Sequence, residues 1–268
     1  MILVTGATGF VGSRLLKRLA AGAGAEPLRG TGRSVRTADL PAGVEAVAAD
    51  VTRPETLPVA LLDVTTLVHA TAITANLKEP YRGAYREINE TGTRNLMKVA
   101  KEAGVSRVLL MSGLSAPAEE GSYMATRIGM EKAVRDSGIP YVILQPSVLF
   151  GDGAEFIAAL SRVARYSPVL PLLGDPEIKF QPLWIEDLLR ILEQSITAEK
   201  HLGQAIPIGG PEHVTFRQVL ETICAAMSIR RLLVPLPLPI AALQARVMAA
   251  LLPRPTLIMI HQRACAAV

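Results

Sequence analysis

The sequence predicts an α/β fold, in which a doubly wound parallel sheet is followed by a smaller C-terminal α+β part. Short apolar or β-branched runs alternate with segments of helical periodicity from Met1 to about residue 150. The alternation begins with a strand, a glycine turn and a helix, and it becomes looser beyond residue 150. We therefore expect one domain over residues 1–150 and a smaller subdomain, interwoven with it, over residues 151–268.

Three glycines follow the first strand at three-residue spacing. Gly6 permits a sharp exit from the strand, Gly9 lets backbone N–H groups approach a pyrophosphate, and Gly12 lets the next helix pack closely on the sheet. The helix N-terminus would then face an anion with unpaired N–H groups and the positive end of its dipole. The turn predicts a dinucleotide-binding site, with contacts from Gly6, Thr8, Gly9, Phe10, Val11 and Gly12.

The second expected strand, residues 26–30, leads to two arginines. A carboxylate after this strand would hold the ribose hydroxyls of NAD, whereas an arginine there can receive the 2′-phosphate of NADP. The chain has Arg33 and Arg36 and no acidic residue until Asp39. NADP(H) is therefore favoured and NAD remains possible, the alternative being a solvated basic loop.

Two further strands are expected to end beside the cofactor. Residues 44–52 alternate and stop near Asp50 and Val51, which we place beside the adenine. Residues 66–72 form a strand that runs into small residues, where a cofactor can lie against the backbone. We expect His69 to be packed or next to the cofactor, because the four histidines lack ligand spacing and no metal site is predicted. The contacts expected after this strand are Ala70, Thr71 and Ala72.

A central strand over residues 107–111 ends in Ser112, after a helix predicted over residues 85–103. The carboxyl end of a parallel strand is where open α/β sheets place ligands. Tyr123 opens the next helix and Arg127 lies four residues later, so the two share a helix face. A guanidinium there could stabilise an ionised phenol for general acid/base chemistry; a surface Tyr–Arg pair is the alternative.

The second half contains fewer regular elements. A buried strand from Tyr141 ends in a Pro-Ser turn, and a helix is expected from Phe156. A Pro-rich loop over residues 167–171 comes next, and further on a strand over residues 205–208. Asp187 and Thr215 are expected as helix N-caps.

Composition excludes several classes of protein. Half of the 268 residues are hydrophobic, yet no 18-residue apolar run is present, so no transmembrane helix is expected. The net charge of +4 is scattered and aromatic residues make up 4%, which argues against nucleic-acid binding. Met1 leads directly into the first strand, and two cysteines make no disulfide framework. We therefore expect a cytoplasmic protein, with membrane-surface association left open.

Together the motifs resemble the short-chain dehydrogenase/reductase superfamily, in its extended and atypical branch related to sugar-nucleotide epimerases. Residues 180–187 are similar to the subgroup that contains the nucleotide-binding accessory subunit of respiratory complex I. The resemblance implies a Rossmann-type fold and further cofactor contacts from Asn89, Pro146, Ser147 and Val148. Its motifs are the glycine turn, Asp50-Val51, His69-Ala70-Thr71, Asn89-x-x-Gly92-Thr93-Arg94-Asn95, Ser112, Tyr123-x-x-x-Arg127 and Gln145-Pro146-Ser147-Val148-Leu149-Phe150-Gly151.

The resemblance also assigns catalytic roles. It implies that Ser112 orients a carbonyl and Tyr123 is the acid/base, whereas Arg127 stands where the family has lysine. Arginine keeps the charge but has a planar, larger head group, so the change affects catalysis more than cofactor binding. We expect an NADP(H)-binding oxidoreductase or epimerase-like protein with a modified active site, or alternatively a non-catalytic accessory or assembly protein of a membrane-associated complex.

The resemblance places an unknown small-molecule substrate between the nucleotide domain and the residues beyond 150. A sugar nucleotide would need basic groups for its diphosphate, and the region from Phe156 to Pro171 offers only Arg162 and Arg165. Helices from Tyr85 and Tyr123 form a dimer interface in many relatives, but the oligomeric state stays open. An apolar helix is predicted over residues 237–252; it could meet a membrane surface, a hydrophobic partner or the protein's own subdomain.

Overall fold

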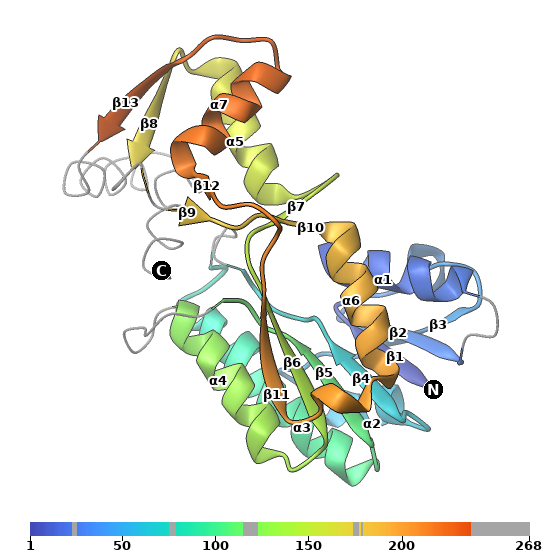
Figure 1. The fold of residues 1–268 in the computed structure, drawn as a ribbon. Coiled ribbons are helices and arrows are strands. Elements are labelled where there is room, and N and C mark those ends of the chain that lie inside the picture. The colour runs from blue at the N-terminus through green and yellow to red at the C-terminus, as the bar shows by residue number, and fades with distance from the viewer. Residues whose placement is uncertain (23–25, 75–78, 115–122, 174–176, 178, 237–268) are drawn as a thin grey trace. The chain divides into compact units, whose positions relative to one another are not determined.

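The computed structural model describes residues 1–22, 26–74, 79–114, 123–173, 177 and 179–236 (Figure 1). The chain forms two compact units. The first comprises Met1–Ile73, Glu79–Pro146 and Ile185–Ile208, and the second comprises Thr74–Lys78, Ser147–Trp184 and Gly209–Val268. The chain beyond residue 150 therefore contributes one α-helix and one strand to the first unit.

The first unit is built on seven strands in the order β11-β6-β5-β4-β1-β2-β3, and every pairing is parallel. The strand order reverses direction between β1 and β4, which is where doubly wound sheets open a crevice for ligands. The predicted doubly wound parallel sheet is confirmed. Its strands are β1 (Ile2–Thr5), β2 (Leu28–Gly32), β3 (Val44–Ala48), β4 (Thr66–His69), β5 (Arg107–Met111), β6 (Tyr141–Pro146) and β11 (Gln204–Ile208).

Helices cover the sheet in two groups, α1 packing with α6 and α3 packing with α2 and α4 (Figure 1). Buried leucine, valine and isoleucine side chains from the central strands fill the core between sheet and helices. The helices are α1 (Phe10–Ala21), α2 (Leu57–Leu61), α3 (Gly92–Glu102), α4 (Tyr123–Asp136) and α6 (Ile185–Thr197), with short 3-10 turns over Thr37–Asp39, Pro54–Thr56 and Glu199–His201.

Several elements differ from their predicted bounds, and the strands expected over residues 44–52 and 66–72 end earlier, at Ala48 and His69. β2 begins at Leu28 and continues to Gly32, two residues later than expected at each end. The single helix predicted over residues 85–103 is divided into a π-helical segment, Arg86–Thr91, and α3. Such segments insert one extra residue per turn and often occur at functional sites.

The second unit has its own small core, where α5 (Glu155–Tyr166) packs on α7 (Phe216–Ala226). Strands β8 (Val169–Leu173) and β13 (Leu232–Leu236) pair in parallel beside them. Two short pairs complete the unit: β7 (Leu149–Phe150) with β10 (Leu183–Trp184), and β9 (Lys179–Phe180) with β12 (Val214–Thr215).

Two predictions for this half of the chain are wrong. The Pro-rich loop expected over residues 167–171 gives way at Val169 to β8, because Leu170 and Leu172 are buried and a two-stranded sheet tolerates Pro171. Asp187 is no N-cap: α6 begins at Ile185, and Asp187 lies in its first turn and pairs with Arg190 at 2.9 Å.

Thr215 is confirmed as the N-cap of α7. Its hydroxyl accepts from the Gln218 backbone N–H at 3.2 Å, and the Gln218 side chain accepts from the Thr215 N–H at 2.7 Å. This reciprocal arrangement satisfies two backbone donors at the start of the helix. The helix predicted over residues 237–252 lies outside the described residues, and none of the helices within them is both long and apolar enough to span a bilayer.

Candidate functional site

The glycine turn joins β1 to α1 by close backbone packing. Gly6 has a φ of +67°, and a Cβ there would lie 2.9 Å from the Ala70 carbonyl oxygen. A Cβ on Gly12 would lie only 2.2 Å from the Gly6 oxygen, so the first turn of α1 rests directly on the turn after β1. Gly9 and Thr8 are exposed. Two glycines therefore have packing roles, while Gly9 and Thr8 form an open surface at the helix N-terminus.

The N-terminus of α1 has the properties of an anion site. Gly9 is the N-cap, it offers no side chain to the first-turn amides, and the first turn has no acidic residue. The dipole of a helix favours negative charge at this end. Arg14 adds a positive charge one turn further on, where its guanidinium lies 4.5 Å from the Phe10 ring centroid and donates to the Phe10 carbonyl at 3.1 Å. Sequence reasoning missed Arg14, although its spacing of four from Phe10 could have revealed it.

The two arginines after β2 have different surroundings. Arg36 forms an ion pair with Asp39 at 3.2 Å, and hydrogen bonds from Arg36 hold the pKa of that carboxyl below its ordinary range. Arg33 is exposed and has no ion-pair partner among the residues that the structure describes. Of the two, Arg33 is therefore the better placed to receive an added anion.

Arg33 lies in the electrostatic neighbourhood of Tyr81 and Asp50. The pKa of Tyr81 is raised by desolvation, then by a hydrogen bond to Glu87 and the charges of Glu87 and Asp50, while Arg33 opposes this rise. Asp50 itself accepts from the Thr52 backbone N–H at 2.9 Å and from the Thr52 hydroxyl at 2.8 Å. Arg33 and Asp50, which follow β2 and β3, therefore both act on the charge of the same side chain, Tyr81.

Val51 has a packing role next to Asp50. Its side chain is buried, and a Cβ on Gly92 would lie 2.6 Å from its Cγ2 atom. The Val51 carbonyl accepts from the Asn95 side chain at 3.0 Å. The start of α3 is therefore fastened to the segment that follows β3.

His69 is fully buried at the end of β4, in a chain of hydrogen bonds. Thr5 Oγ1 accepts from the N–H groups of Ala70 and Thr71, so its own proton goes to His69 Nδ1 at 2.8 Å. His69 Nε2 then carries the ring proton and donates to Thr93 Oγ1 at 2.9 Å. Burial, followed by the positive charge of Arg127, lowers the pKa of His69 to about 3. His69 is therefore a neutral, packed residue. Packing was one of the two roles expected for it, the other being a position next to the cofactor.

Asn89 fixes the segment that follows β4. Its Oδ1 accepts from the Ile73 N–H at 2.8 Å, and its Nδ2 donates to the Ile73 carbonyl at 3.0 Å and to Thr126 Oγ1 at 3.1 Å. Both amide protons are thus used within the protein. Asn89 positions the backbone that follows β4, from Ala70 and Thr71 through Ala72 to Ile73.

Tyr123 and Arg127 meet on α4, one turn apart. Arg127 Nε donates to Tyr123 Oη at 2.8 Å, and Arg127 Nη1 donates to the Met111 carbonyl at 3.2 Å, at the end of β5. The arginine is 7% exposed and has no carboxylate partner in the described parts of the chain. The Tyr123 ring also packs edge-on against Tyr85, with 5.7 Å between ring centroids. A buried cation is therefore directed at the phenol oxygen.

Ser112 points to a different partner. Its hydroxyl donates to Glu131 Oε1 at 2.7 Å, and no hydrogen bond joins it to Tyr123 or Arg127 within the described residues. Glu131 is also buried, and it accepts from Gln145 at 2.7 Å and from Arg135 at 2.9 Å. Sequence reasoning missed Glu131, although the four-residue period from Tyr123 through Arg127 reaches it next.

The Pro-Ser turn after β6 is divided between the units. Pro146 ends β6 in the first unit, and its carbonyl accepts from the Leu114 N–H at 3.1 Å. Ser147 and Val148 belong to the second unit, where the Val148 carbonyl accepts from the Leu183 N–H at 2.9 Å.

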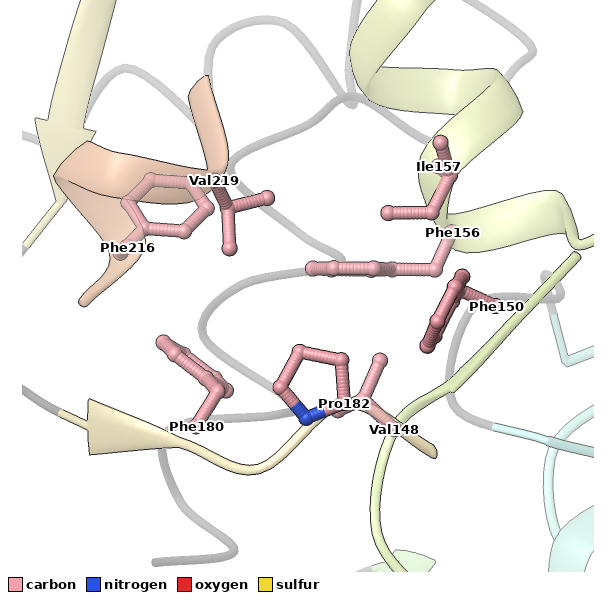
Figure 2. Close-up of a pocket in the computed structure, with 8 residues that line it drawn as sticks. All are labelled: Val148, Phe150, Phe156, Ile157, Phe180, Pro182, Phe216 and Val219. Atoms are coloured by element: carbon pink, nitrogen blue, oxygen red, sulfur yellow. The ribbon is translucent and has the colours of Figure 1, made fainter. Parts of the chain in front are cut away.

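An apolar pocket lies within the second unit (Figure 2). Its cavity volume is about 10 Å³, which is space for no more than about one water molecule. Arg162, one of the two basic residues considered for a diphosphate, is paired with Glu155 at 2.6 Å. This part of the second unit is therefore apolar rather than built for an anion. The lining residues are Val148, Phe150, Phe156, Ile157, Phe180, Pro182, Phe216 and Val219.

The chain matches known proteins over most of its length. The model of the NAD(P)H-binding family matches residues 6–162, which is more than half of the chain. The chain is 26% identical to the NAD(P)H azoreductase of Xenophilus azovorans, over 84% of this chain and 73% of that protein. It is 25% identical to the mitochondrial NADH dehydrogenase [ubiquinone] 1 alpha subcomplex subunit 9 of Arabidopsis thaliana, over 89% of this chain and 60% of that protein.

A solved structure shares the fold. The UDP-glucose 4-epimerase of Thermus thermophilus, in complex with NAD, superposes with a TM-score of 0.71 and 21% identity, over 88% of this chain and 86% of that one. The glycine turn, the strand order and the match to the family model all indicate a dinucleotide-binding fold. The chain belongs to the NAD(P)H-binding family and has the Rossmann fold of short-chain dehydrogenase/reductase proteins.

Proposed function

We propose that the chain is an NADP(H)-dependent oxidoreductase or epimerase-like enzyme of the atypical short-chain dehydrogenase/reductase type. The observation that carries the proposal is the 2.8 Å hydrogen bond from Arg127 Nε to Tyr123 Oη. A guanidinium that donates to a phenol oxygen stabilises negative charge that develops on that oxygen while a proton moves, so Tyr123 would exchange a proton with the substrate. The cofactor, when bound, supplies the hydride acceptor or donor.

The cofactor would lie along the carboxyl ends of β1, β2, β3 and β4. The fit of the residues to a dinucleotide rests on the uncapped N-terminus of α1, the exposed Gly9 and the absence of an acid in its first turn. Arg33 would receive the 2′-phosphate. The further contacts proposed are Gly6, Thr8, Phe10, Val11, Gly12, Arg36, Asp50, Val51, Ala70, Thr71, Ala72, Asn89, Pro146, Ser147 and Val148.

In this proposal Tyr123, and not Ser112, exchanges the proton with the substrate. A hydroxyl has one proton, and that of Ser112 is directed to the buried carboxylate of Glu131. Ser112 would then accept a hydrogen bond from a substrate hydroxyl rather than donate one to a carbonyl. The catalytic group therefore comprises Tyr123 as acid/base, Arg127 as its electrostatic partner and Ser112 as an acceptor.

A second candidate function is a non-catalytic dinucleotide-binding accessory protein of a membrane-associated complex. The engagement of Ser112 by Glu131 favours it, because the serine is withdrawn from the role that the family gives it. The likeness to the NADH dehydrogenase subunit of Arabidopsis thaliana supports it as well. In that case Arg127 would stabilise the fold and the cofactor's surroundings without supporting turnover.

Nucleotide binding is tested by fluorescence titration of the full chain with NADPH and, separately, with NADH. We expect Arg33→Ala to weaken NADPH binding about tenfold or more, since a charge-assisted hydrogen bond contributes roughly 1.5–3 kcal/mol, and to leave NADH binding unchanged. Arg190→Ala is the matched control, because Arg190 is an exposed arginine of the first unit that is paired with Asp187 and is not among the proposed contacts. Equal affinities for both nucleotides in both variants would contradict the 2′-phosphate assignment.

Turnover separates the two candidate functions. NADPH oxidation is followed with an azo compound, the substrate class named by the Xenophilus azovorans relative, in the wild type and in Tyr123→Phe. Tyr166→Phe is the control, since Tyr166 is 81% exposed on α5. Loss of activity in Tyr123→Phe alone supports the enzyme, whereas nucleotide binding with no turnover in any form supports the accessory protein.

A further inference from the structure

Tyr85 packs against the phenol ring that we propose as the acid/base. The Tyr85 side chain is buried, and its ring meets that of Tyr123 edge-on, with 5.7 Å between ring centroids and 66° between ring planes. Aromatic pairs favour this geometry, because the positive edge of one ring faces the negative face of the other. Arg127 contacts the same ring from within α4, with its guanidinium 5.3 Å from the Tyr123 centroid. The Tyr123 ring is therefore held by two side chains, only one of which belongs to its own helix.

The π-helical segment that follows Tyr85 places further contacts with α4 on the same face. Asn89 Nδ2 donates to Thr126 Oγ1 at 3.1 Å, and a Cβ on Gly129 would lie 2.7 Å from Glu90 Cγ. In an α-helix the residue five positions after Tyr85 would be rotated by about 140° from it, because 3.6 residues make one turn. The i to i+5 bonding of a π-helix brings that residue back to the same face. The π-helical winding therefore lets Tyr85, Asn89 and Glu90 contact α4 together.

These contacts support the backbone of Tyr123 as well as its ring. Tyr123 lies in the first turn of α4, where backbone N–H groups have no partner within the helix. Thr126 Oγ1 donates to the Tyr123 carbonyl at 2.6 Å, and the same hydroxyl accepts from Asn89. The first turn of α4 is thus fastened to the π-helical segment.

We infer that Tyr85 is a positioning residue for Tyr123, held against it by the π-helical segment. Tyr85 exchanges no proton; it fixes the ring so that the phenol oxygen stays at the Nε atom of Arg127. The inference rests on the proposed acid/base role of Tyr123. A reacting group displaced by about 1 Å can lose about a hundredfold in rate, so loss of the Tyr85 ring should affect turnover more than nucleotide binding.

The kinetic test uses NADPH oxidation with methyl red, an azo dye of the class named by the Xenophilus azovorans relative. We expect Tyr85→Leu to lower kcat by at least about tenfold and to leave the Kd of NADPH within about twofold of the wild type. Tyr85→Phe keeps the ring and should hold kcat within about threefold of the wild type. Tyr141→Leu is the matched control, because Tyr141 is a half-buried tyrosine at the amino end of β6.

Fluorine NMR tests the position of the ring without turnover, in the full chain with 3-fluorotyrosine in place of tyrosine. The Tyr123 signal, assigned with Tyr123→Phe, should shift and broaden in Tyr85→Leu and stay unchanged in Tyr141→Leu. Thr126→Val removes the bond to Asn89 and should move the same signal. This second variant keeps the ring of Tyr85, and it provides the test if Tyr85→Leu does not fold. Circular dichroism and thermal melting establish the fold of each variant.

The outcomes separate this inference from the proposed function. Turnover that is unchanged in Tyr85→Leu, or a Tyr123 signal that moves in neither Tyr85→Leu nor Thr126→Val, would overturn the inference and leave the proposed function standing. Equal losses of kcat and of NADPH affinity in Tyr85→Leu would also overturn it, because they indicate general damage to the fold. A wild type that binds NADPH without turnover would contradict the proposed function, whatever the Tyr123 signal does, and with it the acid/base role that Tyr85 serves.

Discussion

The hydroxyl of Ser112 donates to the carboxylate of Glu131 over 2.7 Å, at a place where both side chains are buried. The same carboxylate accepts from Gln145 and from Arg135, so three donors from β5–α4–β6 converge on it. A buried carboxylate is stable only when it is paired and hydrogen bonded in this way. Glu131 therefore determines where the hydroxyl proton of Ser112 points, at the carboxyl end of β5.

Glu131→Ala should lower the free energy of unfolding by about 2 kcal/mol, because it leaves the buried hydroxyl of Ser112 and the half-buried amide of Gln145 without their acceptor and removes the ion pair of the exposed Arg135. Urea unfolding followed by circular dichroism measures the change. The control is Asp136→Asn, which removes an exposed ion pair with Lys132 on the same helix and should cost less than about 1 kcal/mol. Similar midpoints for the two variants would show that the network contributes no stability.

His69 makes the stability of the first unit sensitive to acid. Its pKa is about 3 in the folded chain and near 6.5 when unfolded, so between these values the unfolded state binds more protons. The free energy of unfolding then rises with pH, and it falls by roughly 1.4 kcal/mol for each pH unit as the solution is acidified from pH 6.5 toward 3. Urea midpoints measured across this range should show the slope.

His69→Gln removes the titrating group and should flatten this slope, even though it lowers stability at neutral pH by disturbing the bonds to Thr5 and Thr93. His213→Gln is the control, because that histidine is exposed in the second unit. An unchanged acid slope in His69→Gln would assign the sensitivity to other groups.

The glycine turn gives a steric prediction. Gly12→Ala would place a methyl group 2.2 Å from the Gly6 carbonyl oxygen. The atoms that it would meet, in Gly6 and Ala7, belong to the backbone, so they cannot move aside as a flexible side chain could. We expect a loss of at least about 2 kcal/mol in stability and the loss of nucleotide binding. Gly113→Ala is the control, since its nearest atom is the Pro146 oxygen at 3.9 Å. A stable Gly12→Ala protein that still binds nucleotide would contradict the close packing of α1 on the turn.

The fold was predictable because its signals are local. The glycine spacing, the apolar runs and the small residues after β4 each act within a few residues, and together they predict the parallel sheet. β8 could not be predicted in this way, since Pro171 argues for a loop and only its pairing with Val234, more than sixty residues later, makes it a strand. Such a long-range pairing leaves no periodicity in the sequence.

The candidate site likewise contains contacts that local spacing predicts and contacts that depend on long-range packing. Tyr123 and Arg127 are four residues apart on one helix, so their contact follows from spacing. The bond between Ser112 and Glu131 joins a strand end to a helix nineteen residues away in sequence and depends on how α4 packs on the sheet. The different surroundings of Arg33 and Arg36 likewise depend on Asp39, which the sequence showed only as the next acidic residue.

Arg127 contributes a positive charge and a planar guanidinium that makes two hydrogen bonds. Two substitutions distinguish the effect of the charge from that of the hydrogen bonds. Arg127→Lys keeps the charge but loses the fork that reaches Tyr123 and Met111, so stability should fall by about 1–3 kcal/mol. Arg127→Gln removes the charge that lowers the pKa of His69, and that pKa should rise, although burial keeps it below 6.5.

Proton NMR titration of the His69 ring in the two variants provides the measurement. The pKa of His69 should stay near 3 in Arg127→Lys and increase in Arg127→Gln. The same pKa in both would mean that burial alone keeps the histidine neutral. A rise confined to Arg127→Gln would show that the arginine's field reaches from the Tyr123 phenol to the end of β4, across the crevice in which we place the cofactor.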